Sequence, residues 1–296
     1  MRRSSGFAGF GCAIALSVGS TAPAFAHTGP GAQAWPVDPL GAALMALLAA
    51  AYAIGERRLT RRGAARTARR QRAVCFWGGW AALAISLAPP LEPLTAVSFA
   101  AHMAQHEIMM LVAAPLLVLS RPLGTLLWGL PRGLGAMVQP RALKRAARWC
   151  VQPLQAWLIH AAVLWGWHIP SAFEAALRSE PVHWLQHSSF LASAVVFWWA
   201  AFAAGRSEYR GAALLSLFTT AAHTSVLGAL LTFSTAIWYP AYALAPRHWA
   251  LSALEDQQLG GLIMWVPGGM VFILAAVMVA ALWLKDLDRR AARDSG

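Results

Sequence analysis

Two pairs of histidines in the sequence have the spacing needed to bind a metal ion. His102 and His106 are separated by three residues, and so are His183 and His187; both pairs lie in apolar segments. On a helix this spacing places two imidazoles on one face, about one turn apart. Neutral imidazole suits copper, zinc, iron and nickel. The two pairs predict a metal site, and His168 is a further candidate ligand.

Other candidate ligands lie close to these pairs in the sequence. His160 precedes His168 by eight residues, which puts both on one face of a helix and could extend the site inward. Thioether sulfur from Met103, Met109 or Met110 would favour Cu(I). The expected cofactor is therefore copper.

Two carboxylates could support a metal-bound imidazole by accepting a hydrogen bond from its second nitrogen. Glu107 follows His106 directly, and Asp256 opens the last apolar segment. Asp256 could equally stabilise the start of its helix through the macrodipole. The alternative for any single histidine, such as His223 or His248, is an imidazole that binds only backbone carbonyls.

The composition indicates that membrane helices position these residues. Of the 296 residues, 58% are hydrophobic and 12% are charged, and the mean hydropathy is +0.51. An all-α, polytopic transmembrane bundle is predicted, because each apolar segment nears the ~20 residues that cross a bilayer. The seven predicted spans are about 38–55, 73–91, 97–119, 153–169, 183–205, 212–234 and 258–284.

The first 26 residues have the pattern of a secretory signal peptide. Arg2 and Arg3 precede an apolar stretch that ends in Ala24-Phe25-Ala26. Cleavage there would leave residues 27–296 as one transmembrane domain, with His27 as a possible copper chelator through its amine and imidazole. The alternative is an uncleaved first helix.

Charge predicts the orientation in the membrane. Residues 56–72 hold eight arginines, so this loop is expected to stay in the cytoplasm. Alternation then places the mature N-terminus in the periplasm, the C-terminus in the cytoplasm and the two histidine pairs near the periplasmic face. The net charge of +12 follows from these loops and does not indicate a nucleic-acid partner.

No enzyme motif is present in the sequence. The three cysteines form no CxxC pair, and His106-Glu107 is not followed by the second histidine of a zinc protease motif. Gly260-Gly261 and Gly268-Gly269 lie in an apolar segment and predict close helix packing rather than phosphate binding. We therefore expect a non-enzymatic protein.

The order of several segments resembles that of the CtaG-type cytochrome c oxidase assembly factors. The segments are His102–His106 running into Ala114-Pro115-Leu116-Leu117, Trp165–Pro170, His183–His187, Trp238-Tyr239-Pro240-Ala241-Tyr242 and Asp256–Trp265. The resemblance runs from about residue 40 to residue 284. It implies a protein of the bacterial inner membrane that helps to mature a haem–copper oxidase by handling copper for its metal centres. The ligands implied are His102, His106, His168, His183 and His187, with Asp256 in support.

Two other functions remain open on the sequence. Histidines on facing helices could ligate haem iron in a membrane redox protein. A copper or small-solute permease would need a polar path to the cytoplasm, and few ionisable residues lie in the spans below His160 and His223. The lipid bilayer and oxidase subunits are the expected partners.

Overall fold

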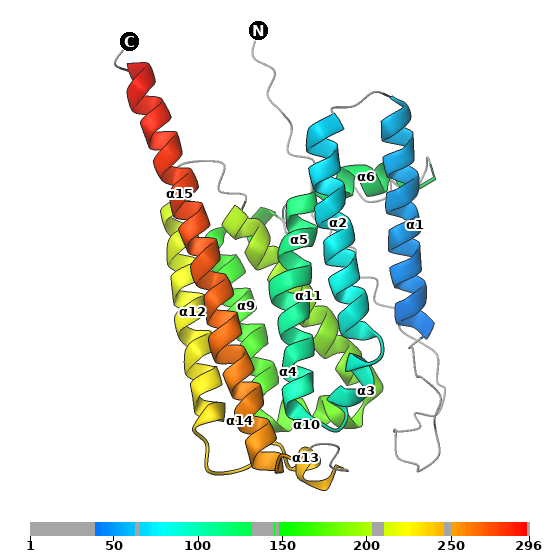
Figure 1. Cartoon of the computed structure of the whole chain (residues 1–296), viewed down its shortest axis with the longest axis vertical. Coiled ribbons are helices and arrows are strands. Elements are labelled where there is room, and N and C mark those ends of the chain that lie inside the picture. The colour runs from blue at the N-terminus through cyan, green and yellow to red at the C-terminus, as the bar shows by residue number, and fades with distance from the viewer. Residues whose placement is uncertain are drawn as a thin grey trace.

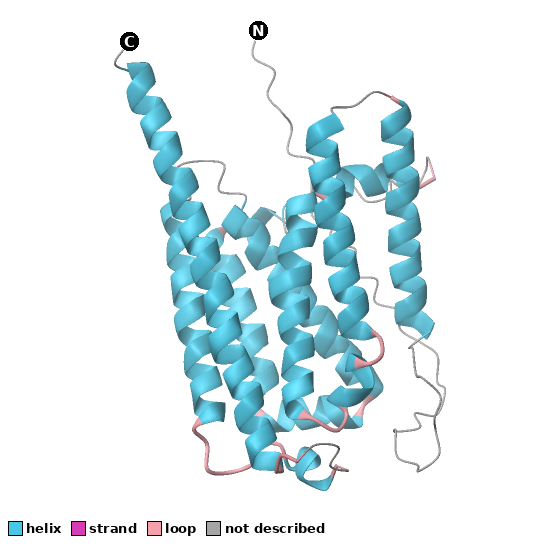
Figure 2. Ribbon diagram, viewed as in Figure 1, coloured by secondary structure: helices cyan, strands magenta, loops and turns pink. Residues whose placement is uncertain are grey.

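The computed structural model describes residues 39–62, 66–131, 145, 148–202, 210–245 and 250–294. Every regular element in these ranges is a helix (Figure 2), which confirms the all-α prediction. The elements are α1 (Pro39–Arg61), α2 (Arg66–Leu87), α3 (Leu91–Thr95), α4 (Phe99–Glu107), η1 (Ile108–Ala113), α5 (Ala114–Ser120), α6 (Pro122–Gly129), α9 (Pro153–His168), α10 (Pro170–Arg178), α11 (Glu180–Phe202), α12 (Arg210–Thr232), α13 (Pro240–Leu244), α14 (Ala253–Ile263), η3 (Met264–Gly268) and α15 (Gly269–Asp294). The predicted signal peptide, residues 1–26, and His27 lie outside the described residues.

Each predicted span coincides with a helix or with a continuous run of helices. The single helices are α1, α2, α9, α11 and α12, and the runs are α4–η1–α5 and α14–η3–α15. Four of them are long and apolar enough to cross a membrane: 39–61, 99–120, 210–232 and 253–292. Of the others, α9 has only 16 residues and α2 begins with several arginines. The crossing of all seven stays a prediction.

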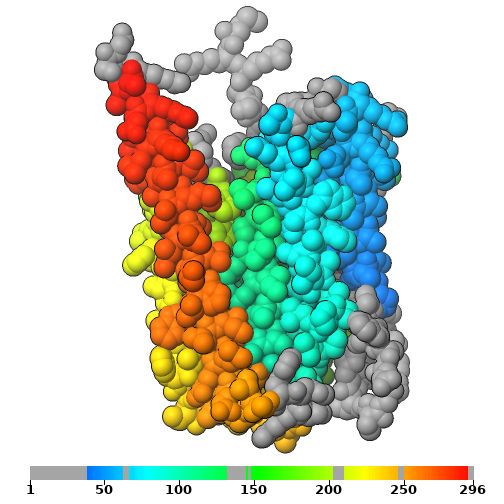
Figure 3. Space-filling view, viewed as in Figure 1, coloured from blue at the N-terminus to red at the C-terminus, as the bar shows by residue number. Residues whose placement is uncertain are grey.

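The long helices lie side by side along one axis (Figure 1). The short helices α3, α10 and α13 gather at one end of the bundle, whereas α6, the end of α1 and the start of α2 lie at the other. The last turns of α15 project beyond their neighbours at this second end (Figure 3). The arginine-rich segment thus lies opposite the end that carries the short helices.

The run α4–η1–α5 is the most enclosed of the four candidate spans. In its most apolar window 56% of the residues are buried, compared with 11% in α1. Its middle part, η1, is a π-helix, in which each turn holds one residue more than in an α-helix. The outer part α4 packs against α14, and the inner part α5 packs against α2 and α11.

Small residues bring α12 and α14 into backbone contact. A Cβ on Gly228 would lie 2.8 Å from the carbonyl oxygen of Gly261, and a Cβ on Gly261 would lie 2.6 Å from that of Gly228. Neither position accepts a methyl group without moving a helix. The predicted close packing at Gly261 is confirmed, and it fixes the height of α14 in the bundle.

Candidate metal centre

The first turn of α4 is held in place by a carboxylate from α14. Asp256 accepts hydrogen bonds from the Ser98 hydroxyl at 2.7 Å and from the Phe99 backbone N–H at 2.6 Å. Ser98 in turn caps the helix by accepting from the Ala101 N–H at 3.1 Å. These contacts satisfy N–H groups that have no partner within a helix. They set the position from which His102 projects.

His102 and His106 bring their imidazoles together on one side of α4. Their Nε2 atoms are 3.1 Å apart, and the side chains are 0% and 1% exposed. Two ring nitrogens at this distance share a proton, or both direct a lone pair at one ion. The predicted HxxxH geometry of this pair is confirmed.

Tyr242 on α13 determines which nitrogen of His102 carries the proton. Its hydroxyl donates to the Thr95 carbonyl oxygen at 3.0 Å, and a carbonyl can only accept. The hydroxyl oxygen, 2.9 Å from Nδ1 of His102, therefore accepts from that nitrogen. Burial raises the pKa of Tyr242 well above its usual value, so the hydroxyl keeps its proton. The Nε2 lone pair of His102 is thus left for a ligand.

His187 on α11 completes a buried group of three ligands. One ligand nitrogen from each of His102, His106 and His187 lies within 4.8 Å of the others, and the ring centroids of His106 and His187 are 5.3 Å apart. Nδ1 of His106 and Nε2 of His187 are buried and have no hydrogen-bond partner among the described residues. Buried polar atoms are nearly always paired, so these atoms indicate a missing ligand. We call these three residues the histidine triad.

His183 lies beside the triad at the edge of the bundle. Its ring centroid is 4.1 Å from that of His187 and 5.5 Å from that of His102. The side chain is half-buried, whereas His187 is 8% exposed and the α4 histidines are lower still. The four histidines of the two HxxxH pairs therefore lie together, with His183 nearest to the surface.

His168 does not join the triad, contrary to the sequence prediction. Its Nδ1 donates to the Leu164 carbonyl oxygen at 2.7 Å within α9. The ring of Phe190 lies near both imidazoles, with its centroid 6.2 Å from that of His168 and 4.6 Å from that of His106. Nε2 of His168 is buried without a partner in the described chain, but the group of three close ligands does not include it.

His160 also lies outside the triad. Ser193 donates to the Phe190 carbonyl oxygen at 3.1 Å, so its oxygen accepts from Nδ1 of His160 at 3.2 Å. The imidazole also stacks on Phe197, with 5.0 Å between centroids. The proposed inward extension of the site through His160 therefore has no support in these contacts.

The three remaining predicted positions contact other parts of the fold. Met103 belongs to the apolar core and packs against Gly260 of α14, because a Cβ on that glycine would lie 3.2 Å from its Cγ. Glu107 faces Gly268 of η3, and its Oε2 has no partner in the described chain. Asp256 bonds to the start of α4 and not to an imidazole. It positions His102 through the helix. Of the two roles that the sequence left open, a hydrogen bond to an imidazole is not among its contacts in the described chain.

Two residues important to the site were given no role in the sequence analysis. Tyr242 belongs to a quoted segment, but its contact with His102 spans 140 residues and leaves no local signal. Gln186 precedes His187, is 0% exposed, and has no partner for its amide oxygen or nitrogen among the described residues. The sequence offered one signal for Gln186, which is a polar amide between His183 and His187 in an apolar segment.

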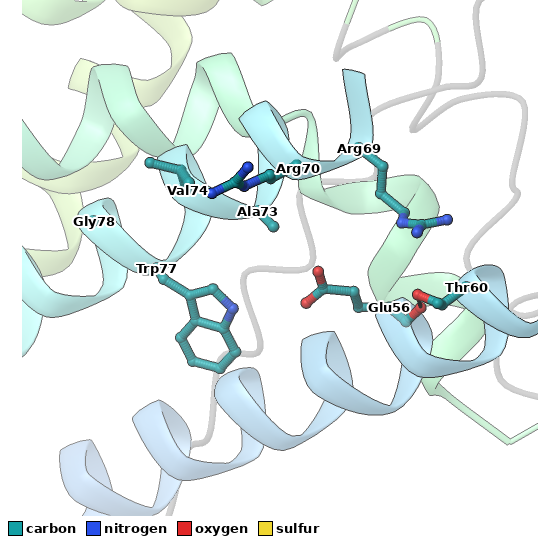
Figure 4. A pocket seen from close by; sticks show the side chains of 8 residues that line it. All are labelled: Glu56, Thr60, Arg69, Arg70, Ala73, Val74, Trp77 and Gly78. Carbon is teal, nitrogen blue, oxygen red and sulfur yellow. Dashed lines mark hydrogen bonds between the residues drawn. The ribbon is translucent and has the colours of Figure 1, made fainter. Parts of the chain in front are cut away.

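A second polar region lies at the arginine-rich end, apart from the histidines. A hollow of about 610 Å³ opens there between α1 and α2, and Glu56 faces Arg69, Arg70 and Trp77 across it (Figure 4). No histidine lines this hollow. The candidate ligands are therefore apart from this hollow, which is a separate feature.

Comparison with known proteins gives the family of the chain. Residues 50–286 match the sequence model of the cytochrome c oxidase caa3 assembly factors. Uncharacterized proteins of Mycobacterium bovis and Mycobacterium tuberculosis are each 26% identical over 269 residues, and one of Mycobacterium leprae is 25% identical over 271. These matches cover 87–88% of the chain but only 40–41% of the relatives, so the chain spans about two fifths of their length. No solved structure matches. The match over most of its length shows that the chain belongs to the cytochrome c oxidase caa3 assembly factor family.

Proposed function

We propose that this protein binds copper at the histidine triad and delivers it to a subunit of a haem–copper oxidase during assembly. The observation that carries the proposal is the group of three buried imidazoles from α4 and α11, whose ligand nitrogens lie within 4.8 Å of one another. Metal–nitrogen bonds of about 2 Å fit a group of this size after a small inward movement. The family description supplies the assembly pathway. The role is non-catalytic.

The arrangement of the four histidines suits transfer by ligand exchange. Copper would arrive at His183, which is half-buried, and would pass to His187, whose ring centroid is 4.1 Å away. The α4 histidines would then complete its coordination. Release follows the same steps in reverse. A triad without a fourth protein ligand also differs from the closed tetrahedral cages of structural zinc sites.

The site belongs on the periplasmic side of the inner membrane in this proposal. Its support is the separation of the two ends of the bundle, with the arginine-rich segment at one end and α4, which carries His102 and His106, toward the other (Figure 1). Seven crossings, a cleaved signal peptide and a copper contact by His27 are parts of the same proposal. An oxidase subunit would then dock at the end formed by α3, α10 and α13.

The haem alternative is disfavoured by the geometry of the triad. Two axial imidazoles must approach iron from opposite faces of the macrocycle, so the porphyrin lies between their helices. Here His102 and His106 are on one helix with 3.1 Å between nitrogens, which leaves no space for a ring system. A Soret band in the absorption spectrum of the purified protein would favour haem binding over copper binding.

The proposal is tested by replacing His102, His106 and His187 with alanine in one variant. A strain that lacks the chromosomal copy should produce either the wild type or this variant under copper limitation. We expect about one copper ion per wild-type chain and oxidase that contains copper. The variant should insert normally but bind no copper and leave the oxidase inactive. His223→Ala is the matched control. A copper content in the triad variant equal to that of the wild type would refute the assignment of these ligands. Active oxidase in the strain that produces the variant would refute the proposed role in oxidase assembly.

A further inference from the structure

The triad is built entirely from uncharged ligands in a closed apolar setting, and this restricts the charge of the ion it can hold. We infer that the copper bound here is monovalent, Cu(I), and that the site discriminates against Cu(II) and Zn(II). The inference rests on the proposed function, since it specifies the cargo of the same site. Three features of the structure lead to it: charge, coordination number and the aromatic walls.

The charge around the triad matches a single positive charge better than two. The energy of burying an ion rises with the square of its charge, so a divalent ion costs about four times as much as a monovalent ion of equal size. Zinc sites commonly offset this cost with thiolates or carboxylates. None of the three ligands here is anionic, and His102 and His106 are 0% and 1% exposed.

The carboxylates of the described chain that lie near the triad are used elsewhere. Asp256 is the nearest along the bonded network, and it accepts from Ser98 and Phe99 at the start of α4, one turn before His102. Glu174 accepts from the Ala241 N–H at 3.1 Å and pairs with Arg178. Glu107 follows His106 directly, but its carboxylate faces Gly268 of η3. No carboxylate is among the three ligands of the triad, so the buried positive charge is smallest when the ion is monovalent.

The number of ligands also favours Cu(I). The described residues offer three nitrogens, and Cu(I) is satisfied by two or three ligands, whereas Zn(II) takes four and Cu(II) prefers a square of four nitrogen or oxygen ligands. A divalent ion would have to add water or His183, whose ring centroid is 4.1 Å from that of His187, to complete its shell.

Aromatic side chains lie against two of the triad imidazoles. The Phe173 centroid is 5.0 Å from that of His102, and the Phe190 centroid is 4.6 Å from that of His106. Both phenylalanines are 0% exposed. An ion at the triad would therefore have apolar rings where a divalent ion needs oxygen ligands. The same walls stabilise the ion of lower charge, so copper would be taken up, held and released as Cu(I) without an electron-transfer step.

The test compares three ions on the purified full-length protein in lipid nanodiscs. Under anaerobic conditions, Cu(I) affinity is measured by competition with bicinchoninate, and Cu(II) and Zn(II) affinities by competition with chelators matched to those ions. We expect one Cu(I) per chain, bound at least about 100-fold more tightly than either divalent ion, a difference of two tenfold steps in the dissociation constant. The Cu(I) complex should give no paramagnetic resonance signal and an X-ray absorption edge typical of Cu(I).

A charge variant sharpens the test. His187→Glu places an anionic ligand at the most exposed position of the triad and should lower the preference for Cu(I) over Zn(II) by about tenfold or more. His187→Gln is the matched neutral control and should weaken the binding of all three ions without changing the order of their affinities. Equal or tighter binding of Cu(II) or Zn(II) by the wild type would overturn the inference and leave the metal site intact. If none of the three ions binds, the proposed function fails as well.

Discussion

Histidine occurs in two settings in this bundle, and the difference shows what makes a buried imidazole a ligand. At the triad, the Nε2 atoms of His102 and His106 point at each other, and Nδ1 of His106 and Nε2 of His187 have no hydrogen-bond partner in the described chain. Deeper in the bundle, His160 donates to Ser193, and His223 accepts from Trp165 at 3.2 Å. Burial is similar for the α4 histidines and His160. The direction of the nitrogen lone pairs separates the two settings.

The largest expected effect is the loss of one triad ligand. His106→Ala should lower Cu(I) affinity by more than about 100-fold, because removing a ligand exceeds the 10- to 100-fold effect of altering an outer hydrogen-bond partner. His160→Ala, an equally buried histidine, should leave the affinity within about threefold, well below that range. Chelator competition on the purified variants measures both. If the two variants behave alike, the distinction between the settings is wrong.

Removing the hydroxyl of Tyr242 should have the next largest effect. Tyr242→Phe deletes the acceptor that holds the proton on Nδ1 of His102, so Nε2 is no longer fixed as the free nitrogen. We expect copper affinity to fall by about tenfold. Tyr239→Phe is the matched control, because that hydroxyl donates to the His168 backbone carbonyl at 3.0 Å and contacts no ligand nitrogen. Equal losses in both variants would assign the effect to the packing of the segment.

His183→Ala should change the rate of exchange more than the affinity. The residue lies outside the group of three, so equilibrium affinity should fall by less than about tenfold. Transfer of Cu(I) to a chelator, followed by stopped-flow absorbance, should slow because the half-buried histidine is the first ligand available to an incoming molecule. Faster or unchanged release would remove His183 from the path.

The smallest effect on copper is expected at Asp256. Asp256→Asn weakens the cap on α4 and should lower the free energy of unfolding by about 1 kcal/mol. Copper affinity should change only through the position of His102. Thermal unfolding in detergent measures the loss of stability, and Asp288→Asn, at an exposed position of α15, is the control. A loss of copper as large as that of His106→Ala would indicate a direct contact between the carboxylate and a ligand.

The sequence predicted the helices and half of the site because both depend on local spacing. Hydropathy located all seven helical segments, with ends that differ from the observed ones by up to 10 residues, and the HxxxH spacing correctly placed His102 beside His106. The register between helices is not local. Local spacing does not determine whether α9 or α11 brings its histidine to α4, and the structure groups His187 rather than His168 with the α4 pair. Tyr242 was missed for the same reason.

The wide turn of η1 lets one span serve two sets of neighbours. An additional residue in a turn rotates everything after it by about 100° relative to an unbroken α-helix. The outer half of the span can thus direct imidazoles at α11 while it packs on α14, and the inner half can still lie against α2. Deleting one residue between Ile108 and Ala113 would convert this π-helical turn into a regular α-helical turn. Either the imidazoles would then rotate away from α11 or α5 would rotate away from α2, so metal binding depends on the length of this segment.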